Sequence, residues 1–456
     1  MVRLAGSGTI LIPSLALCVA AARAAAQPWE LFQDPQQTSF GIDSTPVAVS
    51  NASFAIGNAL GTVRRLTLAG AGRQAALDWQ WNGTAPAGQL AAHAGAGLLA
   101  LTQGRGLVAL SASSGAPVWR CPLGAFAEAA PLPIAAAAGA SHGSGGIGGG
   151  AFVVGTYGGR AVACAVSDGR PLWSVDVGAP VARAAPVRAE LRSSHGADVV
   201  DGVVVVTTAG TAVGLDLSSG ATVWRWTKPG GAMRGGFAAT PAVSDGTVLA
   251  PSVDGRVYAL DPAGPPSNGT AAWTAVTGFA VDATPAAWRG LVVVASDDQR
   301  VTGHAAAEPS AGAELWNVTT GDWVQGGPAV DEASGTVWAG SNDGVVYGIN
   351  ATSGALLAQL DPSGGAGRVQ PSVAWTSERR LIRQGTGLPT AAVPLSASEG
   401  AGEVEPPVRQ GPVLDRLPHV SASPLLLGPS ADGHTLIVAT GAGRVVGLRL
   451  AAASAP

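Results

Sequence analysis

The sequence predicts an all-β protein built from copies of one four-stranded unit. Three observations lead to this prediction. One segment, from Thr240 to Trp273, reads as a complete unit, and most of the chain repeats it. Gly and Pro are abundant, at 65 and 32 of 456 residues, which suits a fold with many turns. Incomplete copies at the two ends of the chain complement each other, as described below.

The clearest copy contains four short strands. TPAV is the first strand, and TVLAPS, rich in β-forming residues, is the second. Asp254-Gly255 is a two-residue hairpin signal, and the alternating segment RVYAL after it is the third strand. A loop then leads to Trp273 on the fourth strand. Four strands cannot bury both of their faces alone, so the unit must stack on copies of itself.

The same pattern recurs along the chain, with an opening Pro-containing strand and a closing Trp. Pro lies early in each opening strand, where its missing N–H costs little. The spacing of the closing residue drifts between about 40 and about 55 residues, which units with variable loops allow. We interpret the closing residues as structural anchors of the units; they are Trp29, Trp81, Trp119, Trp173, Trp224, Trp273 and Trp316, with Leu357 in the Trp position of one further copy.

The two ends of the chain predict a closed ring. The last copy, which ends in RVVGLRL, stops after its third strand, and QPWELF near the start is a Trp-bearing strand with no unit before it. Pairing these segments removes the open sheet edges of a linear array. We therefore predict a β-propeller of about eight four-stranded blades, closed by the N-terminal strand. It spans residues 27–456, with residues 368–419 as an insertion or a degenerate blade, of which we favour the insertion.

The first 26 residues have the features of a secretory signal peptide. Arg3 supplies the positive charge, the apolar stretch 10–22 is too short to span a membrane, and small residues precede Gln27. We expect no membrane span in the mature chain. Five asparagines open N-x-Ser/Thr sequons, which predicts a glycoprotein of the secretory pathway, extracellular or lumenal. These asparagines are Asn51, Asn82, Asn268, Asn317 and Asn350.

The cysteine content and the net charge give less information about structure and function than the repeats do. Cys121 and Cys164, the two cysteines after the signal segment, fall in adjacent units; a disulfide and two buried thiols are both compatible with the sequence. A net charge of −4 without a basic stripe argues against a nucleic-acid partner.

The repeated unit resembles the pyrroloquinoline quinone (PQQ) repeat, whose pattern here includes VALSASSGAPVW, VGLDLSSGATVW and VYALDPAGPPSNGTAAW. The resemblance covers nearly the whole mature chain. It implies the quinoprotein alcohol dehydrogenase-like superfamily, which includes PQQ-dependent dehydrogenases, BamB-like assembly proteins and lumenal sensor domains. In that family the Trp docks between neighbouring blades. The repeat implies the fold and leaves the function open.

The residues needed for quinone chemistry are not evident. The dehydrogenases that the chain resembles carry adjacent cysteines, which this sequence lacks, and hold calcium with carboxylate and amide oxygens. Here the candidate oxygen ligands are Asp282, Asp297, Asp298, Glu314 and Asn342. Asp297-Asp298 is interpreted as a pair of solvated residues in a hairpin turn, and Asn342-Asp343-Gly344 as another hairpin turn. No histidine has metal-binding spacing. We assign no catalytic or metal-binding residue and expect no cofactor.

The sequence therefore predicts a non-enzymatic scaffold that binds a protein or glycan partner through its loop face or its central funnel. The alternative is a PQQ-dependent alcohol or sugar dehydrogenase with calcium and a diverged site, which a carboxylate cluster at the mouth of the ring would favour. Tryptophans outside the anchor position are the only further hint of a binding surface; they are Trp226, Trp288, Trp323, Trp338 and Trp375.

Overall fold

The computed structural model of the chain describes most of the ring. The described residues are 29–33, 45–58, 60–69, 74–84, 87–136, 147–192, 199–262, 271–307, 309–360, 373–375, 381–383, 424–430, 433–439 and 444–450. The signal segment, Asn268 and most of residues 368–419 lie outside this set. Within the described residues, no helix has the length and hydropathy that a membrane span requires.

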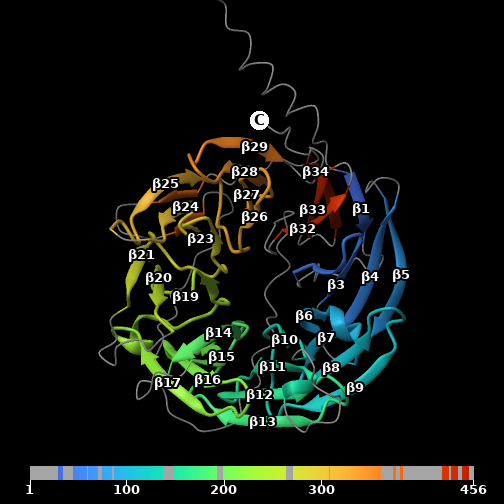
Figure 1. The fold of residues 1–456 in the computed structure, drawn as a ribbon. Coiled ribbons are helices and arrows are strands. Elements are labelled where there is room, and N and C mark those ends of the chain that lie inside the picture. Colours follow the sequence, from blue (N-terminus) through green and yellow to red (C-terminus); the bar gives the residue numbers. More distant parts are fainter. Residues whose placement is uncertain are drawn as a thin grey trace, which may run out of the picture.

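Eight antiparallel four-stranded sheets form the blades of a β-propeller (Figure 1). Blades 1 to 4 consist of β2 (Val47–Ser50), β3 (Ser53–Gly57), β4 (Thr62–Ala69), β5 (Gln74–Asn82); β6 (Ala87–His93), β7 (Leu98–Gln103), β8 (Gly106–Ser111), β9 (Pro117–Pro122); β10 (Leu132–Ile134), β11 (Ala151–Gly155), β12 (Arg160–Ala165), β13 (Pro171–Asp176); and β14 (Val187–Arg192), β15 (Val199–Val206), β16 (Thr211–Asp216), β17 (Thr222–Thr227).

Blades 5 to 8 consist of β18 (Ala242–Ser244), β19 (Thr247–Ser252), β20 (Arg256–Leu260), β21 (Trp273–Val276); β22 (Ala286–Trp288), β23 (Leu291–Ser296), β24 (Arg300–Ala305), β25 (Glu314–Thr319); β26 (Ala329–Asp331), β27 (Thr336–Gly340), β28 (Val346–Asn350), β29 (Leu356–Leu360); and β32 (Leu425–Ser430), β33 (Gly433–Ala439), β34 (Arg444–Leu450), β1 (Trp29–Gln33). A separate pair, β30 (Val373–Trp375) and β31 (Leu381–Arg383), lies in the predicted insertion. Three short 3-10 helices are η1 (Ala94–Ala96), η2 (Ile147–Gly149) and η3 (Gly231–Arg234).

The N-terminal strand closes the ring, as the sequence predicts. β1 pairs antiparallel with β34, and Trp29 lies opposite Gly447. Figure 1 shows the blue β1 beside the red β34 and the remaining blades in chain order around a common axis. Because β1 supplies the fourth strand of blade 8, strands that are far apart in the sequence share one sheet. The outer edge of β34 is therefore paired with β1 and not exposed.

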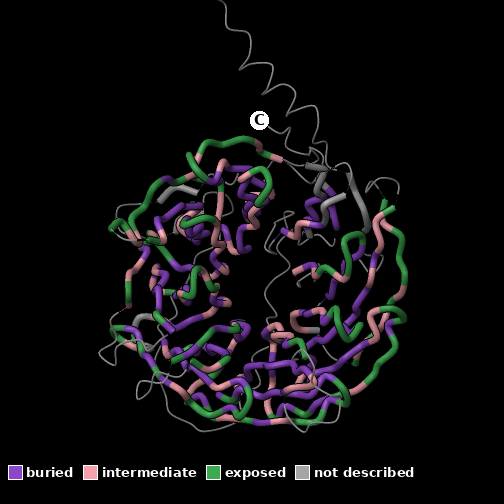
Figure 2. The backbone as a smooth tube through the Cα atoms, viewed as in Figure 1, coloured by how far each residue is buried: buried purple, intermediate pink, exposed green. Residues whose placement is uncertain are grey.

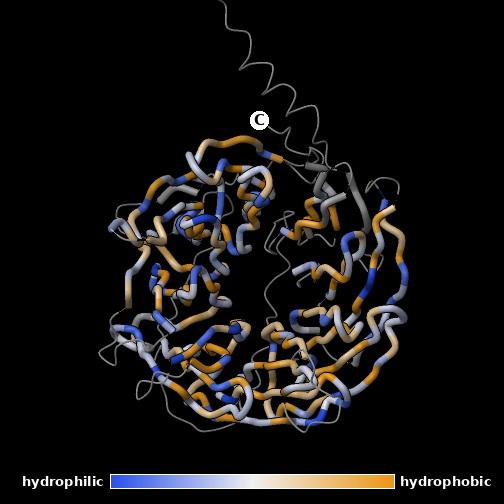
Figure 3. Tube along the Cα trace, viewed as in Figure 1, coloured by the Kyte–Doolittle hydropathy of each residue, from blue (hydrophilic) through white to orange (hydrophobic). Residues whose placement is uncertain are grey.

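The core is divided among the interfaces between blades. Eight hydrophobic clusters occur among the described residues, and each joins two neighbouring sheets. Phe54 and Ile56 of blade 1, for example, pack against Leu427 and Ile437 of blade 8. The second and third strands are accordingly buried and mostly apolar, whereas the fourth strands are largely exposed (Figures 2 and 3). Each blade is thus stabilised mainly by its neighbours.

A disulfide adds a covalent link between two blades. Cys121 on β9 of blade 2 pairs with Cys164 on β12 of blade 3, with 6.3 Å between their Cα atoms. Both side chains are fully buried in the interface between the two sheets. Of the two alternatives that the sequence left open, the structure shows the disulfide.

Candidate functional site

The anchor tryptophans tie each blade to the next through one repeated contact. In four of them, the indole Nε1 donates to a backbone carbonyl of the following blade. The bonds are Trp119 to Val166 (2.8 Å), Trp173 to Leu217 (2.9 Å), Trp224 to Pro262 (3.1 Å) and Trp316 to Ala351 (2.8 Å). In three of these four contacts, a turn glycine three residues after the accepting carbonyl lies against the indole and leaves room for it, as Gly354 does for Trp316. The side chains of these four tryptophans therefore form contacts between blades.

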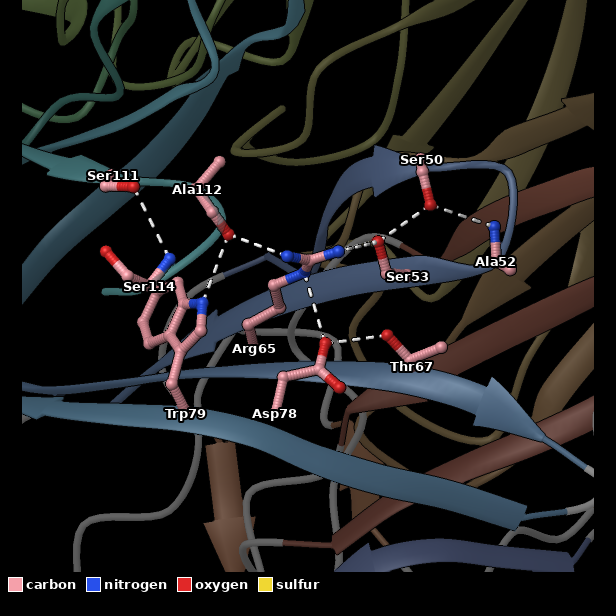
Figure 4. A network of polar contacts seen from close by, with 10 residues as sticks. All are labelled: Ser50, Ala52, Ser53, Arg65, Thr67, Asp78, Trp79, Ser111, Ala112 and Ser114. Atoms are coloured by element: carbon pink, nitrogen blue, oxygen red, sulfur yellow. Dashed lines mark hydrogen bonds and ion pairs between the residues drawn. The ribbon is translucent and has the colours of Figure 1, made fainter. Parts of the chain in front are cut away.

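In blade 1 this position is held by Trp79 instead of Trp81. Trp79 Nε1 donates to the Ala112 carbonyl of blade 2 at 3.1 Å, and Arg65 donates to the same oxygen at 2.8 Å (Figure 4). Trp79 lies opposite Arg65 in the sheet, next to a β-bulge, and Trp119 is placed in the same way opposite Ala109. The two tryptophans of DWQW are two residues apart and face the same side of the strand, so the repeat pattern did not distinguish them.

Blade 7 has no fourth-strand Trp, and the residue in the anchor register is Ala358, not Leu357. Ala358 lies opposite Gly348, whereas Leu357 is about half exposed on the outside of the ring. Trp338 on β27, in the same row of the sheet, packs over Gly348 and contacts blade 8 through Leu436 and Val438. An indole from an inner strand thus fills the interface that the missing Trp leaves open.

The predicted glycosylation sites lie on turns and outer strands. Asn51, Asn82 and Asn317 are exposed. Asn350 is partly buried, and its Oδ1 accepts hydrogen bonds from Thr352 and Ser353 in its turn. Among the candidate oxygen ligands, Glu314 is also exposed on an outer strand and accepts a hydrogen bond from Asn317. It is not part of the constellation described next.

The remaining candidate residues meet at one end of the ring, which we call the loop face. Because the strands are antiparallel, the turns between second and third strands share an end with the loops that lead from each fourth strand to the next blade. The loops of this face that the structure describes in full are 123–131, 177–186, 228–241, 277–285 and 320–328. They lead into the first strands, which contact one another around the axis in almost every pair of adjacent blades.

In blades 3 to 7, a loop residue lies beside a turn residue on the loop face. The turn residue's N–H donates to a carbonyl of the loop, as Asp297 does to Ala280 and Asn342 does to Trp323. The loop residue follows that carbonyl by two positions. The pairs are complementary in two blades: Tyr157 donates to Glu128 at 2.8 Å in blade 3, and Asn342 donates to Gln325 at 3.2 Å in blade 7. In blade 6 the corresponding pair is Asp282 and Asp297, two carboxylates.

The neighbouring turn carboxylates have structural roles. The interpretation of Asp297-Asp298 as solvated turn residues is wrong for Asp297, which is buried. Asp298 accepts from the Gly278 N–H at 2.7 Å, and Asp343 accepts from the Gly321 N–H at 2.7 Å. Asp254 holds Lys228 at 2.7 Å in a fully buried ion pair. Burial alone would raise the pKa of Asp254, but hydrogen bonds, above all from Lys228, lower it.

Asp282 and Asp297 do not have such partners. Only 7% of Asp297 is exposed, and one oxygen of each carboxylate is buried without a hydrogen bond. Burial, followed by the charge of Asp282, raises the pKa of Asp297 to about 6, although a hydrogen bond from Gln325 opposes this. Burial likewise raises the pKa of Asp282, and the charge of Arg183 lowers it in part. Two acidic groups thus share a site in which ionisation is costly.

The unpaired acceptors are concentrated here. Among the described residues, all four buried side-chain oxygens without a partner lie on the loop face of blades 5 to 7; they belong to Asp254, Asp282, Asp297 and Asn342. The Gln325 carboxamide connects Asn342 with Asp297. Sequence reasoning named Asp282, Asp297 and Asn342 but missed Gln325, Arg183 and Glu128. Each of these three lies three residues before the Pro that opens a first strand, a signal present in the sequence.

This site does not fit PQQ. The cofactor carries three carboxylates, and the surrounding acidic groups include Asp298 and Asp322. Of the nearby cations, Lys228 is paired with Asp254, and Arg183 lies 3.2 Å from Glu128. A trianion would therefore meet negative charge here. The described residues also contain no group of three or more His, Cys, Asp or Glu side chains placed to hold a metal ion.

The sequence family agrees with the fold. The family described as outer membrane protein assembly factor BamB matches residues 134–265 and 254–424 of the chain. The chain belongs to this family. No curated protein matches it. The crystal structure of BamB from Moraxella catarrhalis superimposes on this BamB-family chain with a TM-score of 0.59 at 14% identity, covering 93% of this chain and 98% of that one.

Other propellers are similar to the same extent. Sqt1 from Saccharomyces cerevisiae gives a TM-score of 0.62 at 11% identity and covers 94% of this chain and 100% of its own. The C-terminal WD40 domain of Sif2 gives 0.59 at 9% identity, with 93% and 99% covered. At these identities the likeness shows the propeller fold, and function has to be argued from the loop face.

Proposed function

We propose that this protein is a non-enzymatic scaffold of the secretory pathway that binds a partner protein through the loop face of blades 5 to 7. The observation that carries the proposal is the combination of buried, unpaired acceptors with exposed apolar side chains on one rigid surface. Met233 is 96% exposed and Phe279 is 55% exposed, each on a loop of this face. Exposed apolar groups beside polar ones are typical of interaction sites.

The relatives support a binding role. The family's description refers to outer membrane protein assembly, which is a role of those proteins. A closed ring also holds many loops in fixed positions, so little conformational entropy is lost when a partner binds. Among the described residues of the loop face, no hydrogen-bonded pair of a nucleophile and a base is seen, and the proposal includes no chemical step and no cofactor.

Site-specific photo-crosslinking tests the proposal. A benzophenone side chain in place of Phe279 or Met233 is expected to capture a discrete partner protein in cells that make the glycosylated chain. Leu315 and Val118, which are similarly exposed on outer strands, are the matched control positions. Equal capture at all four positions, or no capture on the loop face, would contradict the proposal. A glycan-only ligand would leave no protein adduct and would be detected on a glycan array.

A second candidate function remains to be tested because Asp282 and Asp297 do come together. This is the kind of carboxylate cluster that a PQQ-dependent dehydrogenase would need. Titration of the mature protein with PQQ and calcium, followed by melting temperature and dye reduction with alcohols and sugars, separates the two functions. We expect no saturable rise and no turnover, since the electrostatics disfavour the cofactor.

A further inference from the structure

We propose that Asp282, Asp297 and Asn342 form a notch that binds a primary ammonium group, the head of a lysine side chain on the partner protein. This inference rests on the proposed scaffold function and specifies the chemistry that the partner presents. It is carried by the pairing scheme of the loop face, in which blade 6 alone among blades 3, 6 and 7 opposes two like charges.

The unpaired atoms of the notch are all acceptors. Asp282, Asp297 and Asn342 each have one buried side-chain oxygen that accepts no hydrogen bond. The amide nitrogen of Asn342 donates to Gln325. Among the described residues, the buried side-chain nitrogens without a hydrogen bond are the indole nitrogens of Trp226, Trp288 and Trp338 and the Nε of Arg65, which lies 3.2 Å from Asp78. All four residues lie on strands, outside the turns and loops of this face. A ligand that completes the notch must therefore bring donors and positive charge, and an ammonium has three N–H donors and no acceptor.

A hard metal ion matches the notch less well. Calcium takes six to eight oxygen ligands, whereas three side-chain oxygens are free here. The neighbouring carboxylates Asp298 and Asp343 are held by backbone N–H groups and cannot turn toward a metal without losing those bonds. The number of free acceptors equals the number of ammonium donors.

The fold already contains a bound ammonium one blade away. Lys228, at the start of the loop into blade 5, places its Nζ 2.7 Å from Asp254 on the turn of that blade, and Tyr258 donates to the same carboxylate. The register-equivalent residues in the next two blades are Thr277 and Thr320, which have no charge. Blade 5 thus carries its own cation, and blade 6, with more negative charge, receives none from this position.

The surroundings suit the rest of a lysine side chain. Phe279 lies on the same loop as Asp282, and Trp323 lies on the same loop as Gln325. An apolar stem of four carbons packs on such side chains while its charged end reaches polar partners. Burial of the ammonium against two carboxylates would also offset the repulsion between Asp282 and Asp297.

The test uses n-butylammonium as the probe, titrated into the full mature protein at constant ionic strength while the melting temperature is followed. A saturable rise is expected with a Kd on the order of 1 mM, which corresponds to about 4 kcal/mol. Tetramethylammonium has the same charge and no N–H donor, and should give no rise. Asp282→Asn and Asp297→Asn should each reduce the response at least about tenfold.

Asp245→Asn is the matched control, because Asp245 carries one negative charge on a turn at the opposite end of blade 5. It should respond like the native chain. Equal responses to both ammonium ions, a larger response to calcium that Asp297→Asn removes, or no response would each overturn the inference.

If n-butylammonium binds and the crosslinking finds no partner protein, the notch binds a free amine: the scaffold function then fails, and the lysine assignment with it. If crosslinking succeeds but Asp297→Asn does not weaken capture, the inference alone fails.

Discussion

Carboxylates on the loop face differ in their hydrogen bonds, even where they occupy similar turn sequences. Asp297 and Asp298 are adjacent in one turn, yet Asp298 is fixed by a backbone N–H and Asp297 has a buried oxygen without a partner. The sequence supports only the statement that both belong to a hairpin turn. The difference between the two carboxylates depends on the path of the 277–285 loop, because this loop places the Gly278 N–H at Asp298.

The unpaired carboxylate predicts a gain of stability on its removal. Asp297→Asn is expected to raise the free energy of unfolding at pH 7.5 by about 2 kcal/mol, because the pKa of Asp297 is about 6 in the folded chain and near 4 in the unfolded chain. The folded form therefore binds the proton more tightly. The native chain loses stability as pH rises from about 4 to about 6, and the loss is complete above that range.

Urea unfolding at pH 4 and pH 7.5 measures this effect. The difference between Asp297→Asn and the native chain should nearly vanish at pH 4. Asp298→Asn is the control: it weakens bonds from the Gly278 and Arg300 N–H groups and should lower stability at both pH values. A loss of stability in Asp297→Asn at pH 7.5 would show that the carboxylate, including its buried Oδ1, is stabilised in its charged form.

At the scale of strands and turns, the repeat made the fold predictable because the same contact between a Trp and a turn Gly recurs between neighbouring blades. The Gly and the Trp of each copy serve adjacent blades: the Trp of one blade lies against the turn Gly of the next. The blade count, the strand order and the closing strand follow from that pattern. The two wrong anchor assignments, Trp81 and Leu357, arose where the fourth-strand sequence departs from it, since a register shift relocates which residue faces the next blade.

The Trp–Gly contact predicts which glycines tolerate a side chain. A Cβ at Gly354 would lie 2.6 Å from the Trp316 Cβ, at a φ of +70°. Gly246 has a φ of +77° and open space around it, so Gly246→Ala incurs the backbone strain alone, about 1 kcal/mol. Gly354→Ala should cost at least about 2 kcal/mol more in urea unfolding. Equal costs would mean that the indole is not packed against this turn.

The disulfide is a second contact between neighbouring blades, and its contribution is measurable. Its two cysteines are 43 residues apart, and closure of a loop of that size stabilises a chain by about 2 to 4 kcal/mol. Reductant should therefore lower the melting temperature of the native chain by several degrees. The double variant Cys121→Ala, Cys164→Ala should melt lower and show no response to reductant. An unchanged native melting temperature would indicate free thiols.

For the whole molecule, stability depends on closure. Removal of residues 27–33 leaves β34 without its outer partner and opens the ring between blades 8 and 1. We expect the melting temperature to fall by at least about 5 °C and the exposed edge to promote association. A chain that begins at Gln27 is the control. A synthetic peptide of residues 27–36 should restore the melting temperature when added in trans, and a shortened chain as stable as the control would argue against closure by β1.

The closing strand also sets the order of events during synthesis. β1 leaves the ribosome before the other described strands, and its partner β34 leaves after them. Until β34 is made, the Trp- and Phe-bearing β1 has no partner strand, while seven blades assemble behind it. The nascent protein must therefore keep a hydrophobic end from pairing with other chains, and a chaperone that shields that end would set the yield of correctly joined rings.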